Sequence, residues 1–105
     1  MAAEAELQRS ILELLEAKRF VHWRQPLGGI RMGSGKHRKN PMSGFPDIAG
    51  VFPSGRMFAI EVKAPGEKPK PHQQEWLDKL GKSGVLVVVA KSIDDVLIAL
   101  AKAEQ

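Results

Sequence analysis

Apolar residues recur at helical spacing in two separate parts of the chain. Leu7, Ile11 and Leu14 follow one another at intervals of four and three residues among charged neighbours, which predicts an amphipathic helix over residues 3–18. A second apolar stripe of this kind follows Ser92, and a serine hydroxyl commonly caps the first turn of a helix. The pattern therefore predicts amphipathic helices on either side of the central part of the chain.

The central part alternates between apolar runs and turn residues, which predicts strands. Residues 20–24 are rich in aromatic and β-branched side chains and precede Pro26. Residues 47–52 and 57–63 flank a Pro-Ser-Gly-Arg sequence, which predicts an antiparallel hairpin. The continuous apolar run at 85–90 is typical of a strand that is buried on both faces.

A further helix is expected between the last two predicted strands. Prolines and a glycine within residues 64–71 end the preceding strand, and Trp76, Leu77 and Leu80 form an apolar face over residues 72–80. The resulting order, α-β-β-β-α-β-α, predicts a small α/β sandwich around a mixed sheet. We expect residues 1–105 to form one domain.

The composition excludes several classes of protein. The chain is 43% hydrophobic and 27% charged, within the globular range, and it has no cysteine, which excludes disulfides, zinc-thiolate sites and thiol nucleophiles. No apolar stretch is long enough to cross a membrane, and the N-terminal residues are rich in glutamate where a signal peptide would be apolar. We therefore expect a soluble, intracellular (cytoplasmic) protein with no membrane partner.

The net charge of +4 is concentrated in one part of the chain. Residues 17–46 contain lysines and arginines but no acidic residue. Within them, residues 31–46 combine cations, glycines and prolines, which predicts a flexible basic loop that closes on DNA phosphates; a solvated loop without a ligand is the alternative. The residues expected to contact DNA lie in this loop or outside it in other basic stretches: Arg24, Arg31, Lys36, His37, Arg38, Lys39, Lys68 and Lys70.

The predicted hairpin also brings two carboxylates together. Asp47 and Glu61 fall opposite each other across the turn, and Lys63 lies on the same face of its strand as Glu61. Adjacent carboxylates repel each other unless a pKa rises or a hard cation such as Mg²⁺ binds, and a nearby lysine can stabilise negative charge on a phosphate. The cluster is suited to phosphodiester hydrolysis, and an exposed ion-pair face is the alternative.

The order of these motifs is more specific than any one of them. The segments Gly-Phe-Pro-Asp at 44–47 and Glu-Val-Lys at 61–63, followed by Gln73 and then Trp76, resemble the virus-type replication-repair nuclease (VRR-NUC) domain of the PD-(D/E)xK nuclease superfamily. The resemblance implies a restriction-endonuclease-like fold and a divalent cofactor, Mg²⁺ or Mn²⁺. The residues that it implies as metal ligands are Asp47, Glu61 and the backbone carbonyl of Val62, with Lys63 as the catalytic lysine.

Two more polar residues complete the site that the resemblance implies. Gln73 would reach the site to position substrate or water, and the neighbouring Gln74 is the alternative. Glu4 matches the acidic residue of the first helix in these nucleases, and Glu6 is the alternative.

The function that the resemblance implies is cleavage of branched DNA, such as four-way (Holliday) junctions or flaps in DNA repair, by a metal-dependent homodimer of phage or bacterial origin. Two alternatives stay open: a site-specific restriction-type endonuclease and a non-catalytic nucleic-acid-binding module. Of the remaining rings, His22 is expected to be structural, and His37 and His72 to contact DNA. Trp23 and Trp76 are expected in the core, with base stacking by one of them as the alternative.

Overall fold

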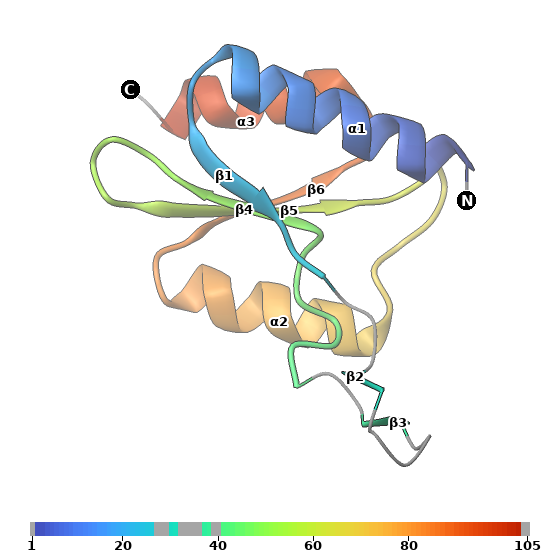
Figure 1. Ribbon diagram of the computed structural model, residues 1–105. Helices are drawn as coiled ribbons and strands as arrows, with labels where there is room; N and C mark the ends of the chain where they lie inside the picture. Colours follow the sequence, from blue (N-terminus) through green and yellow to red (C-terminus); the bar gives the residue numbers. More distant parts are fainter. Residues whose placement is uncertain (1, 27–29, 32–36, 39–40, 104–105) are drawn as a thin grey trace.

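A mixed sheet with helices on both faces forms the structure, a computed structural model that describes residues 2–26, 30–31, 37–38 and 41–103 (Figure 1). Two helices, α1 and α3, cover one face of the sheet, and α2 covers the other (Figure 1). The elements in chain order are α1 (Ala2–Ala17), β1 (Val21–Arg24), β2 (Ile30–Arg31), β3 (His37–Arg38), β4 (Ile48–Val51), β5 (Met57–Val62), α2 (Pro71–Lys82), β6 (Leu86–Ala90) and α3 (Ile93–Ala103).

The main sheet confirms the predicted topology. Its strand order is β1-β4-β5-β6, with antiparallel pairing from β1 to β5 and parallel pairing between β5 and β6. The predicted hairpin turns at Gly55, whose φ of +92° is a conformation that glycine adopts readily. The parallel pair needs a crossover, and α2 provides it. Among the described residues, no helix is long and apolar enough to cross a membrane.

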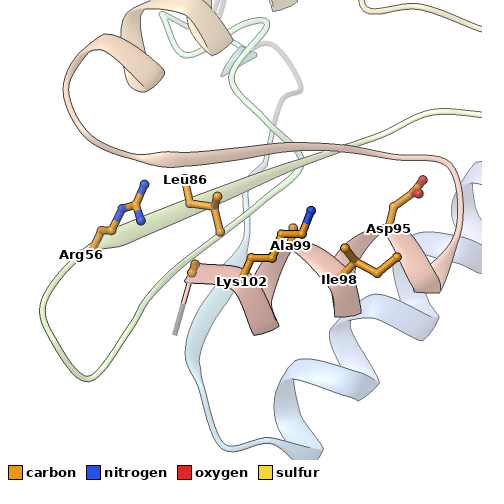
Figure 2. A pocket seen from close by; sticks show the side chains of 7 residues that line it. Arg56, Leu86, Asp95, Ile98, Ala99 and Lys102 are labelled. Atoms are coloured by element: carbon orange, nitrogen blue, oxygen red, sulfur yellow. The ribbon is translucent and has the colours of Figure 1, made fainter. Parts of the chain in front are cut away.

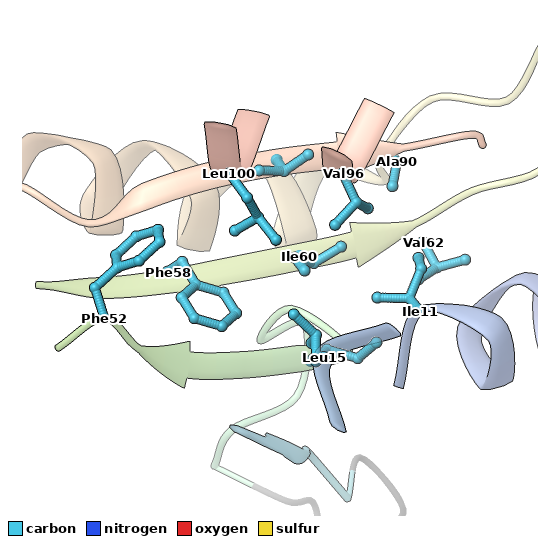
Figure 3. Close-up of a cluster of buried hydrophobic side chains, with 11 residues drawn as sticks. Ile11, Leu15, Phe52, Phe58, Ile60, Val62, Ala90, Val96 and Leu100 are labelled. Carbon is cyan, nitrogen blue, oxygen red and sulfur yellow. The ribbon is translucent and has the colours of Figure 1, made fainter. Parts of the chain in front are cut away.

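The hydrophobic core lies between the sheet and the helices α1 and α3 (Figure 3). Phe58, Ile60 and Val62 alternate along β5 and are at most 3% exposed, because each points to this face of the strand. Across from them, the apolar stripes of the two helices contribute Ile11 and Leu100. The apolar faces predicted from the sequence for the helices and for β5 therefore pack together in one cluster.

Close backbone approach explains one glycine in β4. A Cβ added at Gly50 would lie 2.2 Å from the Phe58 ring and 2.5 Å from the carbonyl oxygen of Val21. Gly50 pairs with His22 on one side and with Phe58 on the other, so the missing side chain leaves room for the ring beside β4. A larger residue would force the ring or the backbone to shift.

The structure departs from the sequence pattern at the edges of the sheet. β6 is the last strand in the order, and Val87 and Val89 are only partly buried, so the prediction of burial on both faces was only partly right. β1 is the opposite edge, where Trp23 is 41% exposed, and the expectation that it lies in the core was wrong. The short strands β2 and β3 pair with each other within the region expected to be a basic loop.

Candidate active site

The turn into β4 brings Asp47 to the end of β5. Ile48 pairs with Ile60, so Asp47, one residue earlier, lies beside the end of the neighbouring strand. The Val62 backbone N–H donates to Asp47 Oδ2 at 2.8 Å, and the Gln25 N–H donates to the Asp47 carbonyl oxygen at 2.8 Å. Asp47 is therefore held on both sides by main-chain groups of adjacent strands.

Glu61 is a buried carboxylate with too little compensation. It is 1% exposed, and within the described residues its Oε1 has no hydrogen-bond partner. Burial, followed by the negative charge of Asp47, raises the pKa of Glu61 from its ordinary 4.5 to about 7. Burial also raises the pKa of Asp47, although the Val62 hydrogen bond and the charge of Lys63 oppose this rise. Two neighbouring acids thus share a site that disfavours their charged forms.

Lys63 places a positive charge beside this pair. Its Nζ lies 3.7 Å from Glu61 Oε2, which makes an ion pair longer than a hydrogen bond. The residue is 7% exposed, and its backbone N–H donates to the Ala90 carbonyl oxygen at 3.0 Å, which fixes it beside β6. An exposed ion-pair face, the alternative open from the sequence, is therefore wrong, because both partners are buried.

The N-terminal turn of α1 reaches the same end of β5. Glu4 Oε1 accepts a hydrogen bond from the Ala64 backbone N–H at 3.1 Å, one residue beyond Lys63. The charge of Glu4 is close enough to contribute to the raised pKa of Asp47, after burial as the main cause. Glu6, the alternative from the sequence, is exposed. The structure therefore brings Glu4 to the carboxylate pair.

Gln73 has a structural role at the start of α2. Its Oε1 accepts a hydrogen bond from the Lys70 backbone N–H at 2.8 Å, in the geometry of a capping box. The alternative residue, Gln74, is exposed, and its Nε2 donates to Asp78 along the helix. Among the described contacts, no hydrogen bond joins either glutamine to Asp47 or Glu61.

The turn before Asp47 is fastened to α2 by residues whose role the sequence did not predict. The Trp76 indole N–H donates to the Ser43 carbonyl oxygen at 3.1 Å, and its ring packs edge-on against Phe45. Gly44 has φ +89°, and a Cβ there would lie 2.7 Å from the His72 ring. His72 therefore packs against this turn, and because it is also exposed, its expected contact with DNA stays a prediction. The Gly-x-Pro-Asp sequence is the one available signal for this packing.

The oxygen atoms at this site suit a hard divalent cation, although side chains alone do not complete a metal site. Among the described residues, no group of three or more His, Cys, Asp or Glu side chains is placed to hold a metal ion. The carboxylates of Asp47 and Glu61 lie at the end of β5, where the Val62 backbone N–H meets Asp47 Oδ2. Among the described residues, Glu61 Oε1 is buried without a protein partner, which is the state of an oxygen that a cation would satisfy.

The residues expected to contact DNA lie in several parts of the chain. Arg24, Lys68 and Lys70 are exposed. Arg31 lies in β2, and His37 and Arg38 lie in β3. Lys36 and Lys39 fall outside the described residues. His22, expected to be structural, has its Nδ1 2.8 Å from the Phe20 carbonyl oxygen.

A separate cavity of about 410 Å³ lies between β6 and α3 (Figure 2). Arg56, Ile98 and Lys102 line it, and none of the carboxylates described above does. Asp95, also on its wall, accepts a hydrogen bond from the Lys91 backbone N–H at 2.8 Å. The cavity is therefore distinct from the candidate active site.

Comparison with known proteins adds three findings. The family model of the VRR-NUC domain matches residues 2–94. The protein named "Putative nuclease p44" of Acyrthosiphon pisum secondary endosymbiont phage 1 is 41% identical over 51 residues, which cover 49% of this chain and 55% of that protein, so the match spans only about half of the relative. A solved structure titled "VRR_NUC domain" superimposes with a TM-score of 0.70 at 26% identity, over 94% of this chain and 95% of that chain. A second, titled "VRR_NUC domain protein", shares the fold with a TM-score of 0.68 at 22% identity, over 95% and 86%.

Proposed function

The chain belongs to the VRR-NUC domain family and is a nuclease domain, and we propose that it is a metal-dependent endonuclease that cleaves branched DNA. The observation that carries the proposal is the pair of Asp47, half-buried, and Glu61, buried, at the end of β5, with one cation, Lys63, at 3.7 Å from Glu61. A buried carboxylate whose oxygen has no partner among the described residues is costly in a fold that needs only stability, so its presence beside a second acid favours a catalytic role.

Asp47, Glu61 and the Val62 carbonyl would hold the metal ion, Mg²⁺ or Mn²⁺. These are hard oxygen donors, and Glu61 Oε1 is without a partner among the described residues. A divalent ion bound here supplies positive charge that polarises the scissile phosphate. Ion binding would also keep both acids ionised, against the upward shift of their pKa values.

The remaining residues would orient the substrate and stabilise its charge. Lys63 holds its ammonium beside Glu61, so that it can neutralise the negative charge that develops on the phosphate. Glu4 fixes the end of β5 through Ala64 and keeps Lys63 in place. Gln73 uses Oε1 to cap α2, which leaves the two Nε2 donors for a phosphate oxygen or water.

The choice of branched DNA follows from what the fold can offer a duplex. Backbone charge supports binding to any DNA, whereas reading a sequence requires an element placed in a groove. Each described helix packs against the sheet (Figure 1), and Arg24 in the edge strand and Lys68 and Lys70 before α2 are exposed. Recognition by phosphate contacts and junction shape is therefore the mode we propose, with a homodimer that would place two sites on a four-way junction.

A panel of end-labelled DNAs tests the proposal directly. Duplex, flap, single-stranded and four-way-junction substrates are incubated with Mg²⁺, with Mn²⁺ and with chelator, and Glu61→Gln serves as the matched inactive control. We expect cleavage of branched DNA by the wild type only with a divalent ion. Incision at one short sequence in linear duplex would indicate a restriction-type enzyme. Binding without cleavage under every condition would indicate a non-catalytic module. Sedimentation of the protein alone and with a junction tests the homodimer.

A further inference from the structure

A groove runs along the seam between α1 and the edge strand β1. Its two parts, of about 330 Å³ and 580 Å³, share Arg9, Leu12 and Arg24 on their walls, so they adjoin each other. We call the two hollows together the seam groove. The two parts differ in their other lining residues. The smaller part includes Gln8, and the larger part includes Glu13, Glu16 and Trp23.

Both walls of the seam groove lead directly to the carboxylate pair. On α1, Glu4 lies one turn before Gln8 and hydrogen-bonds the Ala64 backbone N–H. On the other wall, Gln25 follows Arg24 and donates its backbone N–H to the Asp47 carbonyl oxygen at 2.8 Å. A strand bound in the seam groove would therefore lie next to the candidate active site.

The charges in the groove favour a short anionic strand at the end near the site. Arg9 and Arg24 are exposed, and within the described residues neither has an ion-pair partner. Glu13 and Glu16 line only the part that also contains Trp23, where they would repel phosphate. The charges thus accept phosphates beside the two arginines and disfavour them beside Trp23, which leaves that part to an uncharged base.

Trp23 adds an aromatic surface beside these arginines. It is 41% exposed, and its indole N–H donates to Gln25 Oε1 at 3.3 Å, which orients the ring. The opposing residue in the register is the small Ala49, so no large neighbour covers the ring from β4. Exposed tryptophans beside cations commonly stack on unpaired bases, because every base offers a π-face.

We propose that the seam groove binds the unpaired DNA strand next to the scissile phosphate, with Arg9 and Arg24 on its phosphates and one base stacked on Trp23. This inference rests on the proposed nuclease function and deepens it, because it gives a reason for selecting branched over continuous duplex DNA. In a duplex, bases are stacked on their neighbours, so no base is free for Trp23. At a branch or flap, an unpaired nucleotide can occupy the groove without paying for unstacking.

The first test measures equilibrium binding of a fluorescein-labelled ten-nucleotide thymidine strand by anisotropy in chelator, where no cleavage occurs. Trp23→Ala is expected to weaken binding by about tenfold or more, the range for loss of one base stack. Trp23→Phe keeps a stacking ring and should stay within about threefold of wild type. Val21→Ala is the matched control, since Val21 is 66% exposed on the same edge strand. Circular dichroism and melting temperature verify that each variant is folded.

The second test removes the two arginines together. Arg9→Ala with Arg24→Ala should flatten the slope of log affinity against log salt by about 1.4 for the single strand, two contacts at about 0.7 each. The control is Lys82→Ala with Lys102→Ala, which removes the same charge from exposed positions outside the groove. An equal loss of slope in both double variants would overturn the groove and leave only a general charge effect.

The outcomes separate this inference from the proposed function. If Trp23→Ala binds the thymidine strand as tightly as wild type, the groove is overturned, even when Glu61→Gln abolishes cleavage. If Trp23→Ala loses single-strand affinity while wild type never cleaves, the groove stands and the nuclease assignment fails. An equal loss of affinity for a blunt duplex also overturns the inference, because a duplex has no unpaired base to stack.

Discussion

Two adjacent residues of β5 show how differently buried positions can be used. Ile60 is fully buried among apolar side chains of the core, whereas Glu61 is 1% exposed and has an oxygen without a hydrogen-bond partner among the described residues. They point to opposite faces of the same strand, so one stabilises the fold and the other costs stability. The contrast indicates that the core supports a strained polar cluster, as active sites commonly require.

The largest expected effect is loss of cleavage when either acid, Asp47 or Glu61, is replaced by its neutral amide. Asp47→Asn or Glu61→Gln should lower the rate on branched DNA by at least about 100-fold, since even residues that only support metal ligands cost 10- to 100-fold when changed. Gel assays under single-turnover conditions measure the rate. DNA affinity in chelator is the control and should change little. Near-normal cleavage by either variant would mean that the metal lies elsewhere.

A substitution in the hydrophobic core should instead lower the stability of the fold. Phe58 is fully buried and meets Phe20 and Phe52 edge-on or tilted, so Phe58→Ala should lower the free energy of unfolding by about 3–5 kcal/mol. Urea unfolding followed by circular dichroism measures the change. The effect should be the same with and without divalent ions. A loss below 1 kcal/mol, on the order of a surface substitution, would show that the core does not depend on this ring.

Glu61 should make stability depend on pH in an unusual direction. Its pKa is raised from 4.5 to about 7 in the folded state, so the folded protein binds more protons than the unfolded chain between these values. This stabilisation is fully present below pH 4.5 and is lost progressively as the pH rises through 7; the total loss is on the order of 3 kcal/mol. In chelator, the stability of Glu61→Gln relative to wild type should therefore increase from pH 5 to pH 8, roughly the range of this titration.

Thermal unfolding of both proteins across that range measures the difference. Excess Mg²⁺ should reduce it, because an ion bound by the folded wild type stabilises it by mass action. A constant difference from acid to alkaline pH would mean that Glu61 does not titrate with folding. The experiment also separates stability from activity, since the variant that is expected to gain stability is the one expected to lose cleavage.

The sequence predicted more of the apolar side than of the polar side. Period-two alternation in β5 and the stripe of α1 are local patterns, so the hairpin and the core faces of Phe58 and Ile11 could be inferred without the structure. The burial of Glu61 could not, because an alternating polar residue normally indicates an exposed face. It is a tertiary property, because the neighbours of Glu61, such as its register partner Val89 in β6, are distant in the sequence.

The same reasoning explains the outcomes for individual side chains. The position of Trp23 depends on β1 being an edge strand, and strand order is not encoded in any local segment. The choice of Glu4 over Glu6 depends on where the first turn of α1 meets Ala64, a contact between residues sixty positions apart. His72 packs on Gly44 because α2 and the turn before β4 are neighbours in space.

The smallest effect concerns Gln73, which caps a helix and is also proposed to contact substrate. Its Oε1 caps α2 through the Lys70 N–H, so Gln73→Ala should cost about 0.3–1.5 kcal/mol of stability through the cap alone. Gln73→Glu keeps an acceptor at that position and should retain most of this stability. It removes the Nε2 donors, however, and adds a negative charge near the phosphate. If those donors contact substrate, Gln73→Glu should cleave more slowly than wild type at unchanged stability, with Gln74→Glu as the matched charge control on the exposed face. If Gln73→Ala is destabilised while both glutamate variants cleave normally, Gln73 is a helix cap and belongs with the structural region alone.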